Sequence, residues 1–394
     1  MGETVLDACL MAPSAAIRKR TLSKEVDFDE HVDDTRSSTA SVTAIVSEPP
    51  GQGPICSSCG LRHGLRHNGK ALEAPPGIFC QGPERQGWLE SAFCIVTLGL
   101  VCGMFYIIIP VQVFLILHAL VHRSVCTGTL AALLFSSMWW PLDNRFPWPA
   151  FSQCYLFRAW RRYFAMECIV TEALEPGRRY MLAESPHGIV PLGQQLLSAT
   201  VCQHTYPGVG QMAGVAADIV MWIPVIRQLY GWLGTRCAGR GTIASMYRDG
   251  VNVAVVLGGI AEMFLVSTEE ERVYLKNRKG FVRMAVMQGA DVVPLFFFGN
   301  SSLFTLVGGG DGSLLLSISR RIKSSLLVFH GRFGLTVPYR RPLRMVSGRP
   351  IHVQQTDDPS QEYIDSIHQE LVERTVELYE TYRPAWETRP LKIY

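Results

Sequence analysis

The chain has 394 residues, of which 48% are hydrophobic and only 18% carry a charge. Soluble globular proteins usually carry about 25% charged residues, so this deficit indicates a membrane protein or one with a large apolar face. The net charge of +3 is too small to favour a nucleic-acid partner. The 11 cysteines are scattered rather than spaced as a disulfide framework, which favours reduced thiols facing the cytosol.

Residues 1–88 are predicted to be disordered. They are rich in Ser, Thr, Gly, Pro and charged residues, and such a composition cannot bury enough apolar surface to offset the entropy lost on ordering. No clean targeting signal is expected, because the first residues include Glu3 and Asp7 and lack a basic stretch followed by an apolar core. The acidic run at residues 25–34 disfavours a plastid transit peptide.

A short cluster inside this region carries the residue types of a zinc site, namely Cys56, Cys59, His63 and His67. Its spacing is much tighter than that of a standard zinc finger, and no hydrophobic segment nearby offers a core. We therefore expect a flexible Gly/His/Arg linker here and predict no metal site.

Residues 89–141 are predicted to form a membrane-embedded helical hairpin. Residues 91–117 contain no formal charge, and after a polar break residues 124–140 add a second uncharged run that ends in aromatic side chains. About 20 apolar residues suffice to cross a bilayer, and aromatic residues gather at its interfaces. A single span followed by a re-entrant segment is the alternative. The hairpin is preferred because Arg123 is the only basic residue in the break of sequence between the two runs, whereas several arginines follow the second run.

Residues 142–394 are predicted to form a cytosol-facing catalytic domain. Its first part, up to about residue 163, combines Trp, Tyr and Phe with arginines, which suits the headgroup layer of a membrane. Packing of these side chains against the domain itself is an equally ordinary alternative.

From about Tyr163 the pattern alternates between strands and helices, which is typical of an α/β fold. The predicted strands are residues 179–183, 251–257 and 291–298, and the predicted helices are residues 192–202, 241–248, 280–288 and 359–382. The last helix is the clearest, with Asp358 expected to cap it and Pro359 in its first turn.

A histidine stands in a tight turn between a predicted strand and a predicted helix. Pro186 fixes its own φ, and Gly188 gives the backbone freedom and allows a ligand to approach closely. His187, between them, is well placed as a general base because its pKa lies near working pH. A lone histidine is more often a core or surface residue, so this reading depends on its context.

A second candidate block follows the strand at residues 251–257. Gly258 and Gly259 permit close approach of a ligand, and their N–H groups suit a developing oxyanion, while Glu262 supplies a carboxylate. An ordinary turn is the alternative.

A third block, just before the helix at residues 280–288, clusters Lys276, Arg278 and Lys279. Basic side chains beside the start of a helix make a phosphate site. A solvated basic turn is the alternative.

Taken together and in this order, the three blocks resemble the type-2 diacylglycerol acyltransferase family, whose histidine motif is usually His-Pro-His-Gly in animals and Glu-Pro-His-Ser in plants. Here the motif is Ser185-Pro186-His187-Gly188, so His187 occupies the second histidine position and Ser185 replaces the first. The resemblance runs from about Trp148 to Arg383. It includes the blocks at residues 278–281, 289–294 and 348–351.

The resemblance implies an α/β domain of the glycerolipid-acyltransferase type, a mixed sheet flanked by helices, with an N-terminal transmembrane hairpin. It implies transfer of an acyl group from acyl-coenzyme A to diacylglycerol, in the endoplasmic reticulum membrane and also at lipid droplets. His187 is the implied base, and the implied substrate-binding residues are Gly188, Gly258, Gly259, Lys276, Arg278, Lys279 and Asn300. No cofactor or metal is expected, membrane lipid is an expected partner, and a homo-oligomer is left open.

The carboxylate partner of the histidine is not fixed by the motif. Related glycerol-phosphate acyltransferases place an Asp five residues after their histidine, where this chain has Leu192. Glu184 is close in sequence but separated from His187 by two residues, so Glu262 is the better candidate for an orienting role in catalysis.

Other functions stay open at this point. A monoacylglycerol, a long-chain alcohol or phytol are alternative acceptors for the same chemistry. A non-catalytic membrane or lipid-droplet scaffold gains some weight from Ser185. A hydrolase is disfavoured because the chain lacks a Gly-x-Ser-x-Gly motif.

Overall fold

The computed structural model describes most of the chain from residue 86 onward and three short strands before it. The described residues are 66–67, 70–71, 77–80, 86–140, 147–197, 205–206, 208–308, 313–322 and 326–394. Most of residues 1–88 lies outside them, including Cys56, Cys59 and His63 of the predicted Cys/His cluster, whereas His67 lies in the first short strand. The strands there are β1 (Arg66–His67), β2 (Lys70–Ala71) and β3 (Gly77–Cys80).

An eight-stranded mixed sheet forms the centre of the domain, in the order β3-β4-β13-β10-β5-β8-β6-β7. Its central strands are β10 (Ala290–Phe298), β5 (Arg179–Ser185), β8 (Val251–Val256) and β6 (Gln211–Ala216), which run parallel to one another. The remaining strands are β4 (Glu167–Val170), β13 (Arg344–Ser347) and β7 (Arg236–Cys237), and β13 is antiparallel to β10. β3 pairs with β4, although the composition of its region predicted no order.

The central strands are continuous apolar runs because helices cover both faces of the sheet. All nine residues of β10 are buried, as expected for a strand without a solvent face. Along β5 the side chains alternate between two cores, with Tyr180 and Leu182 in one and Met181 and Ala183 in the other. The predicted strands and helices of this region are therefore present, and they form the predicted α/β sheet flanked by helices.

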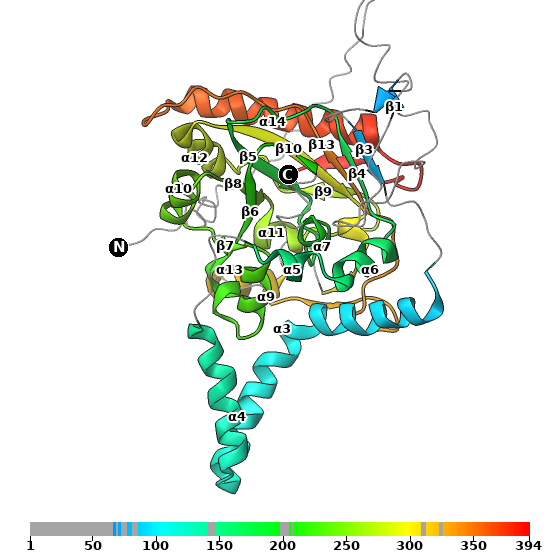
Figure 1. Cartoon of the computed structure of the whole chain (residues 1–394), viewed down its shortest axis with the longest axis vertical. Helices are drawn as coiled ribbons and strands as arrows, with labels where there is room; N and C mark the ends of the chain where they lie inside the picture. The colour runs from blue at the N-terminus through cyan, green and yellow to red at the C-terminus, as the bar shows by residue number, and fades with distance from the viewer. Residues whose placement is uncertain are drawn as a thin grey trace, which may run out of the picture.

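Three helices cover the Met181 face of the sheet (Figure 1). They are α10 (Arg240–Arg248), α12 (Gly280–Gln288) and α14 (Gln361–Tyr382). The opposite face meets the first part of the long helix α3 (Trp88–His122) and several shorter helices. These are α5 (Pro149–Ser152), α6 (Tyr155–Tyr163), α7 (Leu192–Leu196), α11 (Gly259–Met263), α13 (Leu314–Ile322) and α9 (Ile226–Trp232), which packs on α5. The two faces of the sheet thus differ, and the Leu182 face is the one turned toward α3.

Short elements complete the domain. Two further strand pairs are β9 (Glu271–Val273) with β14 (Leu391–Ile393) and β11 (Thr305–Val307) with β12 (Val328–His330). The short 3-10 helices are η1 (Ser137–Trp139), η2 (Asp218–Trp222) and η3 (Asn300–Ser302). The pairing of β14 with β9 holds the last residues of the chain against the domain.

Helices α3 (Trp88–His122) and α4 (Val125–Ser136) form a helical hairpin at the predicted position. Figure 1 shows α3 running along the domain and then bending away from it beside α4, and Pro110 inside α3 is a residue type at which helices bend. The two arms are joined through Gln112, whose Nε2 donates to the Ala131 carbonyl at 3.2 Å. Arg123, in a left-handed conformation, makes the turn, and Ser124 caps α4.

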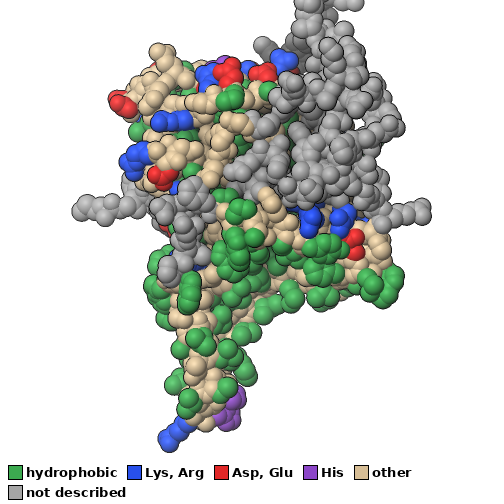
Figure 2. All heavy atoms as spheres, in the orientation of Figure 1, with side chains coloured by type: hydrophobic (Ala, Val, Ile, Leu, Met, Phe, Trp, Pro, Cys, Tyr) green, Lys and Arg blue, Asp and Glu red, His purple; other side chains and the backbone are tan. Residues whose placement is uncertain are grey.

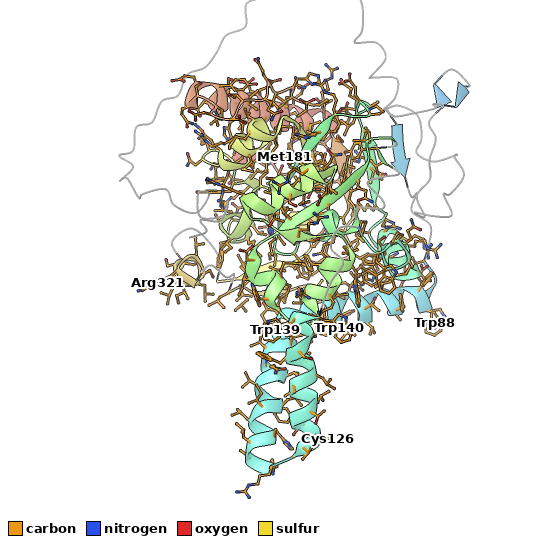
Figure 3. All side chains as sticks on the ribbon, turned by 60° about the vertical axis from the view of Figure 1, so that its left-hand side comes forward. Trp88, Cys126, Trp139, Trp140, Met181 and Arg321 are labelled. Atoms are coloured by element: carbon orange, nitrogen blue, oxygen red, sulfur yellow. The ribbon has the colours of Figure 1, made fainter. Side chains whose placement is uncertain are left out.

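The hairpin and the adjoining edge of the domain are covered with hydrophobic side chains, as Figure 2 shows. By length and composition α3 is able to cross a membrane, with a mean hydropathy of 2.5 in its apolar window. Figure 3 shows Trp139 and Trp140 where the hairpin meets the domain and Trp88 at the far end of α3, along the domain's edge, and all three side chains are exposed. This arrangement suits a membrane interface.

Two sequence predictions need correction. Helix α14 is capped by Ser360, whose hydroxyl accepts the Tyr363 N–H at 3.2 Å, and not by Asp358. Ser caps a helix about as well as Asp, so the helix begins two residues later than predicted and Pro359 precedes it. The helix predicted at residues 192–202 ends at Leu196 in the described part of the chain, which stops at residue 197 before resuming at 205.

Candidate active site

The turn that follows β5 holds His187 at the carboxyl end of the parallel strands. The Ser185–Pro186 peptide bond is cis, and Gly188 has φ +63°, a conformation that L side chains rarely adopt. A Cβ atom on Gly188 would also lie 2.9 Å from the Asn300 carbonyl oxygen. The predicted need for a glycine at position 188 is therefore met in the geometry of this turn.

The imidazole of His187 is held by one of its two ring nitrogens. Nδ1 lies 2.9 Å from the Gly188 carbonyl oxygen, and a carbonyl only accepts, so Nδ1 carries the proton and donates it. Nε2 is then the unprotonated nitrogen, which is able to take a proton from a substrate. Burial lowers the pKa of His187, which keeps the ring in this neutral, basic form at neutral pH.

Glu262 holds the main chain of His187 rather than its ring. One carboxylate oxygen accepts the His187 N–H, and the other accepts the Tyr274 N–H at 2.7 Å. Burial raises the pKa of Glu262 to about 7, against the lowering effect of these two hydrogen bonds and of the Arg278 charge. Glu262 thus contacts the residue that the sequence predicted it to orient, and the contact is made through the backbone.

Asn300, predicted as a substrate-binding residue, is a clamp on the same turn. Its Nδ2 donates to the His187 carbonyl at 2.8 Å and to the Pro186 carbonyl at 3.3 Å, and its Oδ1 accepts the Gly193 N–H at 3.0 Å. Gln194 adds a second donor to the Pro186 carbonyl at 2.8 Å. Because its side chain is already engaged with the backbone, Asn300 positions the turn.

Gly258 and Gly259 lead from β8 into α11, beside the His187 turn. A Cβ atom on Gly258 would lie 2.2 Å from the Glu262 carboxyl carbon, so only glycine allows Glu262 to fold back over it. Gly259 has φ +55°, another conformation that favours glycine. The two glycines are required here to bring Glu262 to His187.

The three basic residues predicted as a phosphate site do not share one surface. Arg278 is buried and donates to the Gly258 carbonyl at 3.0 Å. Its guanidinium carbon lies 4.9 Å from the centre of the Tyr274 ring. Lys279 pairs with Asp365 of α14 at 2.8 Å. Lys276 is exposed, and its N–H donates to Tyr394. Arg278 turns inward because the Gly258 carbonyl and the Glu262 carboxylate offer it negative charge there.

Sequence reasoning missed two contributors to this site. Tyr274 acts through its backbone N–H, which no sequence pattern reveals. Gln194 was visible only as one of two neighbouring glutamines in the predicted helix. Ser185, at the place of the missing histidine, lies with its Oγ 3.5 Å from the Leu295 carbonyl, a weak contact within the sheet. Within the described residues, no group of three or more His, Cys, Asp or Glu side chains is arranged to hold a metal ion.

The fold and the site together define an α/β protein with an enzyme-like centre built around one neutral histidine. The diacylglycerol acyltransferase family matches residues 128–392. The chain is 30% identical over 258 residues to 2-acylglycerol O-acyltransferase 1 of Homo sapiens, covering 60% of this chain and 76% of that protein. It is 31% identical over 259 residues to diacylglycerol O-acyltransferase 2 of Mus musculus, covering 60% of this chain and 66% of that protein.

The chain therefore belongs to the diacylglycerol acyltransferase family, and it is an acyl-CoA-dependent acyltransferase of lipid metabolism. Among solved structures, the lysophosphatidic acid acyltransferase PlsC of Thermotoga maritima matches 69% of this chain and 97% of its own, with 15% identity and a TM-score of 0.35.

Proposed function

We propose that this enzyme is a diacylglycerol O-acyltransferase that makes triacylglycerol, with His187 as its general base. The hydrogen bond from Nδ1 to the Gly188 carbonyl carries the proposal, because it leaves Nε2 as the basic nitrogen. Glu262, Asn300 and Gln194 fix the turn around it. Such rigidity is what a base needs to meet a substrate hydroxyl in one geometry.

The proposed reaction needs no covalent enzyme intermediate. Nε2 takes the proton of the diacylglycerol hydroxyl as its oxygen attacks the thioester carbonyl carbon of acyl-CoA. The tetrahedral intermediate collapses, the carbon–sulfur bond breaks, and the coenzyme A thiolate receives the proton from the His187 imidazolium. The products are triacylglycerol and free coenzyme A. We further propose that donors near Gly258 and Gly259 stabilise the oxyanion and that Lys276 contacts the coenzyme A phosphates.

We also propose that the reaction takes place in the endoplasmic reticulum membrane, with lipid droplets as a second location; the apolar hairpin supports the membrane part of this proposal. Both substrates carry long acyl chains, and the sheet face beneath His187 is the one that packs toward α3. A lipid acceptor entering from the membrane side would then meet the site without crossing water.

A monoacylglycerol acceptor is the second candidate, because 2-acylglycerol O-acyltransferase 1 of Homo sapiens resembles the chain about as closely as diacylglycerol O-acyltransferase 2 of Mus musculus. Acceptor choice depends on the shape and polarity of the pocket, and an assay with both acylglycerols decides between them.

The test is neutral-lipid production in a yeast strain that lacks its own triacylglycerol and steryl-ester synthesis. Wild type is expected to make triacylglycerol. His187→Ala is expected to make it at least about 100-fold more slowly, because the general base is lost. His330→Ala is the matched control, because its Nδ1 also faces the carbonyl of the following glycine, at 3.4 Å, but on β12. Equal triacylglycerol from wild type and His187→Ala would remove His187 as the base. No neutral lipid from any variant, with protein in the membrane, would favour another acceptor or a scaffold.

A further inference from the structure

Glu184 is a buried carboxyl group at the junction of the two loops that form the site. It is the next-to-last residue of β5, three positions before His187, and it is only 4% exposed. Its carbonyl oxygen accepts the Leu257 N–H at 3.0 Å, and Leu257 directly precedes Gly258. The residue therefore lies between the His187 turn and the loop that brings Glu262 to it.

The side chain of Glu184 faces the apolar layer on the α3 side of the sheet. Side chains alternate along β5, and Tyr180 and Leu182, which share its face, pack in the core that contains parts of α3, α7 and α11. Its register partners on the two neighbouring strands are Leu295 and Val256, which offer no polar side chain. This is the side from which a lipid acceptor would approach His187.

Glu184 differs from the other buried carboxyl groups of the described residues. Glu262 accepts two backbone N–H groups, and Asp291 is paired with Arg178 and accepts the Val353 N–H. Glu271 and Glu387 are both paired with Arg389. The Glu184 carboxyl has no hydrogen-bond or ion-pair partner within the part of the chain that the structure describes.

An unpaired buried carboxyl is driven to its neutral form. Burial raises the pKa of Glu184 to about 8, so its carboxyl is mostly protonated at neutral pH. A protonated carboxyl has one O–H to donate, and the apolar register partners of Glu184 offer it no acceptor. An oxygen of a bound molecule would satisfy it.

We propose that the Glu184 carboxyl donates a hydrogen bond to an ester carbonyl oxygen of the acylglycerol acceptor, and so selects acylglycerols over simple long-chain alcohols. An acylglycerol carries an ester carbonyl a few bonds from the hydroxyl that reacts, whereas a long-chain alcohol carries none. The inference rests on the proposed function, in which that hydroxyl meets Nε2 of His187. Glu184 then fixes the glycerol backbone while His187 takes the proton.

The experiment compares three acceptors with one acyl-CoA in membranes containing the full-length chain. The acceptors are a diacylglycerol, its ether-linked dialkylglycerol analogue, which keeps the hydroxyl but lacks ester carbonyls, and a long-chain primary alcohol. Wild type is expected to use the ester at least about tenfold better than the ether in kcat/KM, since one hydrogen bond to a buried group is lost. This arm needs no variant and so does not depend on how a substitution folds.

Variants then assign the preference to Glu184. Glu184→Leu is expected to bring the ester-to-ether ratio close to one and to leave use of the long-chain alcohol unchanged. Glu184→Gln keeps an N–H donor and is expected to keep most of the preference. Met181→Leu, a change of similar volume whose side chain lies on the other face of β5 and outside the histidine motif, is the control.

The outcomes separate the two proposals. Equal use of ester and ether by wild type overturns the role of Glu184 and leaves acyl transfer intact. Loss of activity toward all three acceptors in Glu184→Gln also overturns it, because a charged or acidic group would then be required. If wild type transfers acyl groups to none of the acceptors, the proposed function fails, and the Glu184 proposal with it.

Discussion

The carboxylate of Glu262 accepts the main-chain N–H of His187, while Nδ1 of the His187 ring donates to the carbonyl of the following residue, Gly188. Glu262 therefore fixes where the imidazole stands, and Gly188 fixes which of its nitrogens is basic. A histidine paired with a carboxylate through its ring would instead gain an anion beside its imidazolium. Here one residue sets the position of the imidazole and a different residue sets its tautomer.

Glu262→Gln is expected to lower turnover while the protein still accumulates in the membrane. A carboxylate accepts both the His187 and the Tyr274 N–H groups, but an amide has one acceptor oxygen and must turn its NH₂ toward one of the two donors. The turn should shift, and we expect kcat to fall about tenfold or more, because small displacements of a base are costly. Specific activity per amount of membrane protein measures this. Glu269→Gln, at an exposed position near α11, is the control. Unchanged specific activity would show that Glu262 has no part in the mechanism.

The stability of the wild type is expected to fall as pH rises, and Glu184→Gln is expected to reduce that fall. Burial raises the pKa of Glu184 to about 8 in the folded state, above its ordinary value of 4.5. The stability contributed by the protonated form is therefore fully present below about pH 4.5 and is lost as pH rises through about 8. Thermal unfolding in detergent between pH 5 and pH 9 measures the midpoint of each protein. Parallel curves for the two proteins would contradict a raised pKa at Glu184.

Much of the sheet was predictable because its central strands carry a strong pattern. The runs around β5, β8 and β10 are apolar and bounded by Gly or Pro, and such runs form buried strands wherever they pack. The histidine turn was predictable for a similar reason, since Pro186 and Gly188 constrain the backbone locally. The cap of α14 was misplaced because Asp358 and Ser360 are both good caps two residues apart.

The electrostatics of the site were less predictable, because they depend on contacts between residues far apart in the chain. Arg278 is one of three neighbouring basic residues in the sequence, yet it points inward to the carbonyl of Gly258. Asn300 was predicted to bind substrate, but the hydrogen bonds of its side chain go to the His187 turn and to the Gly193 N–H. The direction in which a side chain points is decided by partners that only the folded chain brings close.

Arg389→Met is expected to destabilise the protein strongly. Arg389 donates to the buried carboxylates Glu271 and Glu387, each at 2.6 Å, and removing it leaves both without that cation. Breaking a buried ion pair by removing one partner costs about 3–5 kcal/mol. The thermal midpoint and the amount of folded protein should both fall. The double variant Arg389→Met with Glu271→Gln should recover part of the loss, because one unpaired carboxylate is then neutral. Failure of the second change to recover any stability would contradict this account.

Substitutions at Lys276 and Arg278 are expected to act on different kinetic constants, although the two residues are neighbours in sequence. Lys276 is exposed, so Lys276→Ala should weaken only a screened contact with the coenzyme A phosphates. We expect the KM for acyl-CoA to rise by a few-fold, with kcat unchanged and the effect lost at high salt. Arg278→Lys should instead lower kcat and stability with little change in KM. A lysine cannot both bind the Gly258 carbonyl and stack on Tyr274, so the support behind Glu262 weakens. Initial rates over a range of acyl-CoA concentrations, at low and high salt, separate the two effects. A rise in KM for Arg278→Lys with unchanged kcat would instead place its guanidinium at the phosphates, despite its inward position.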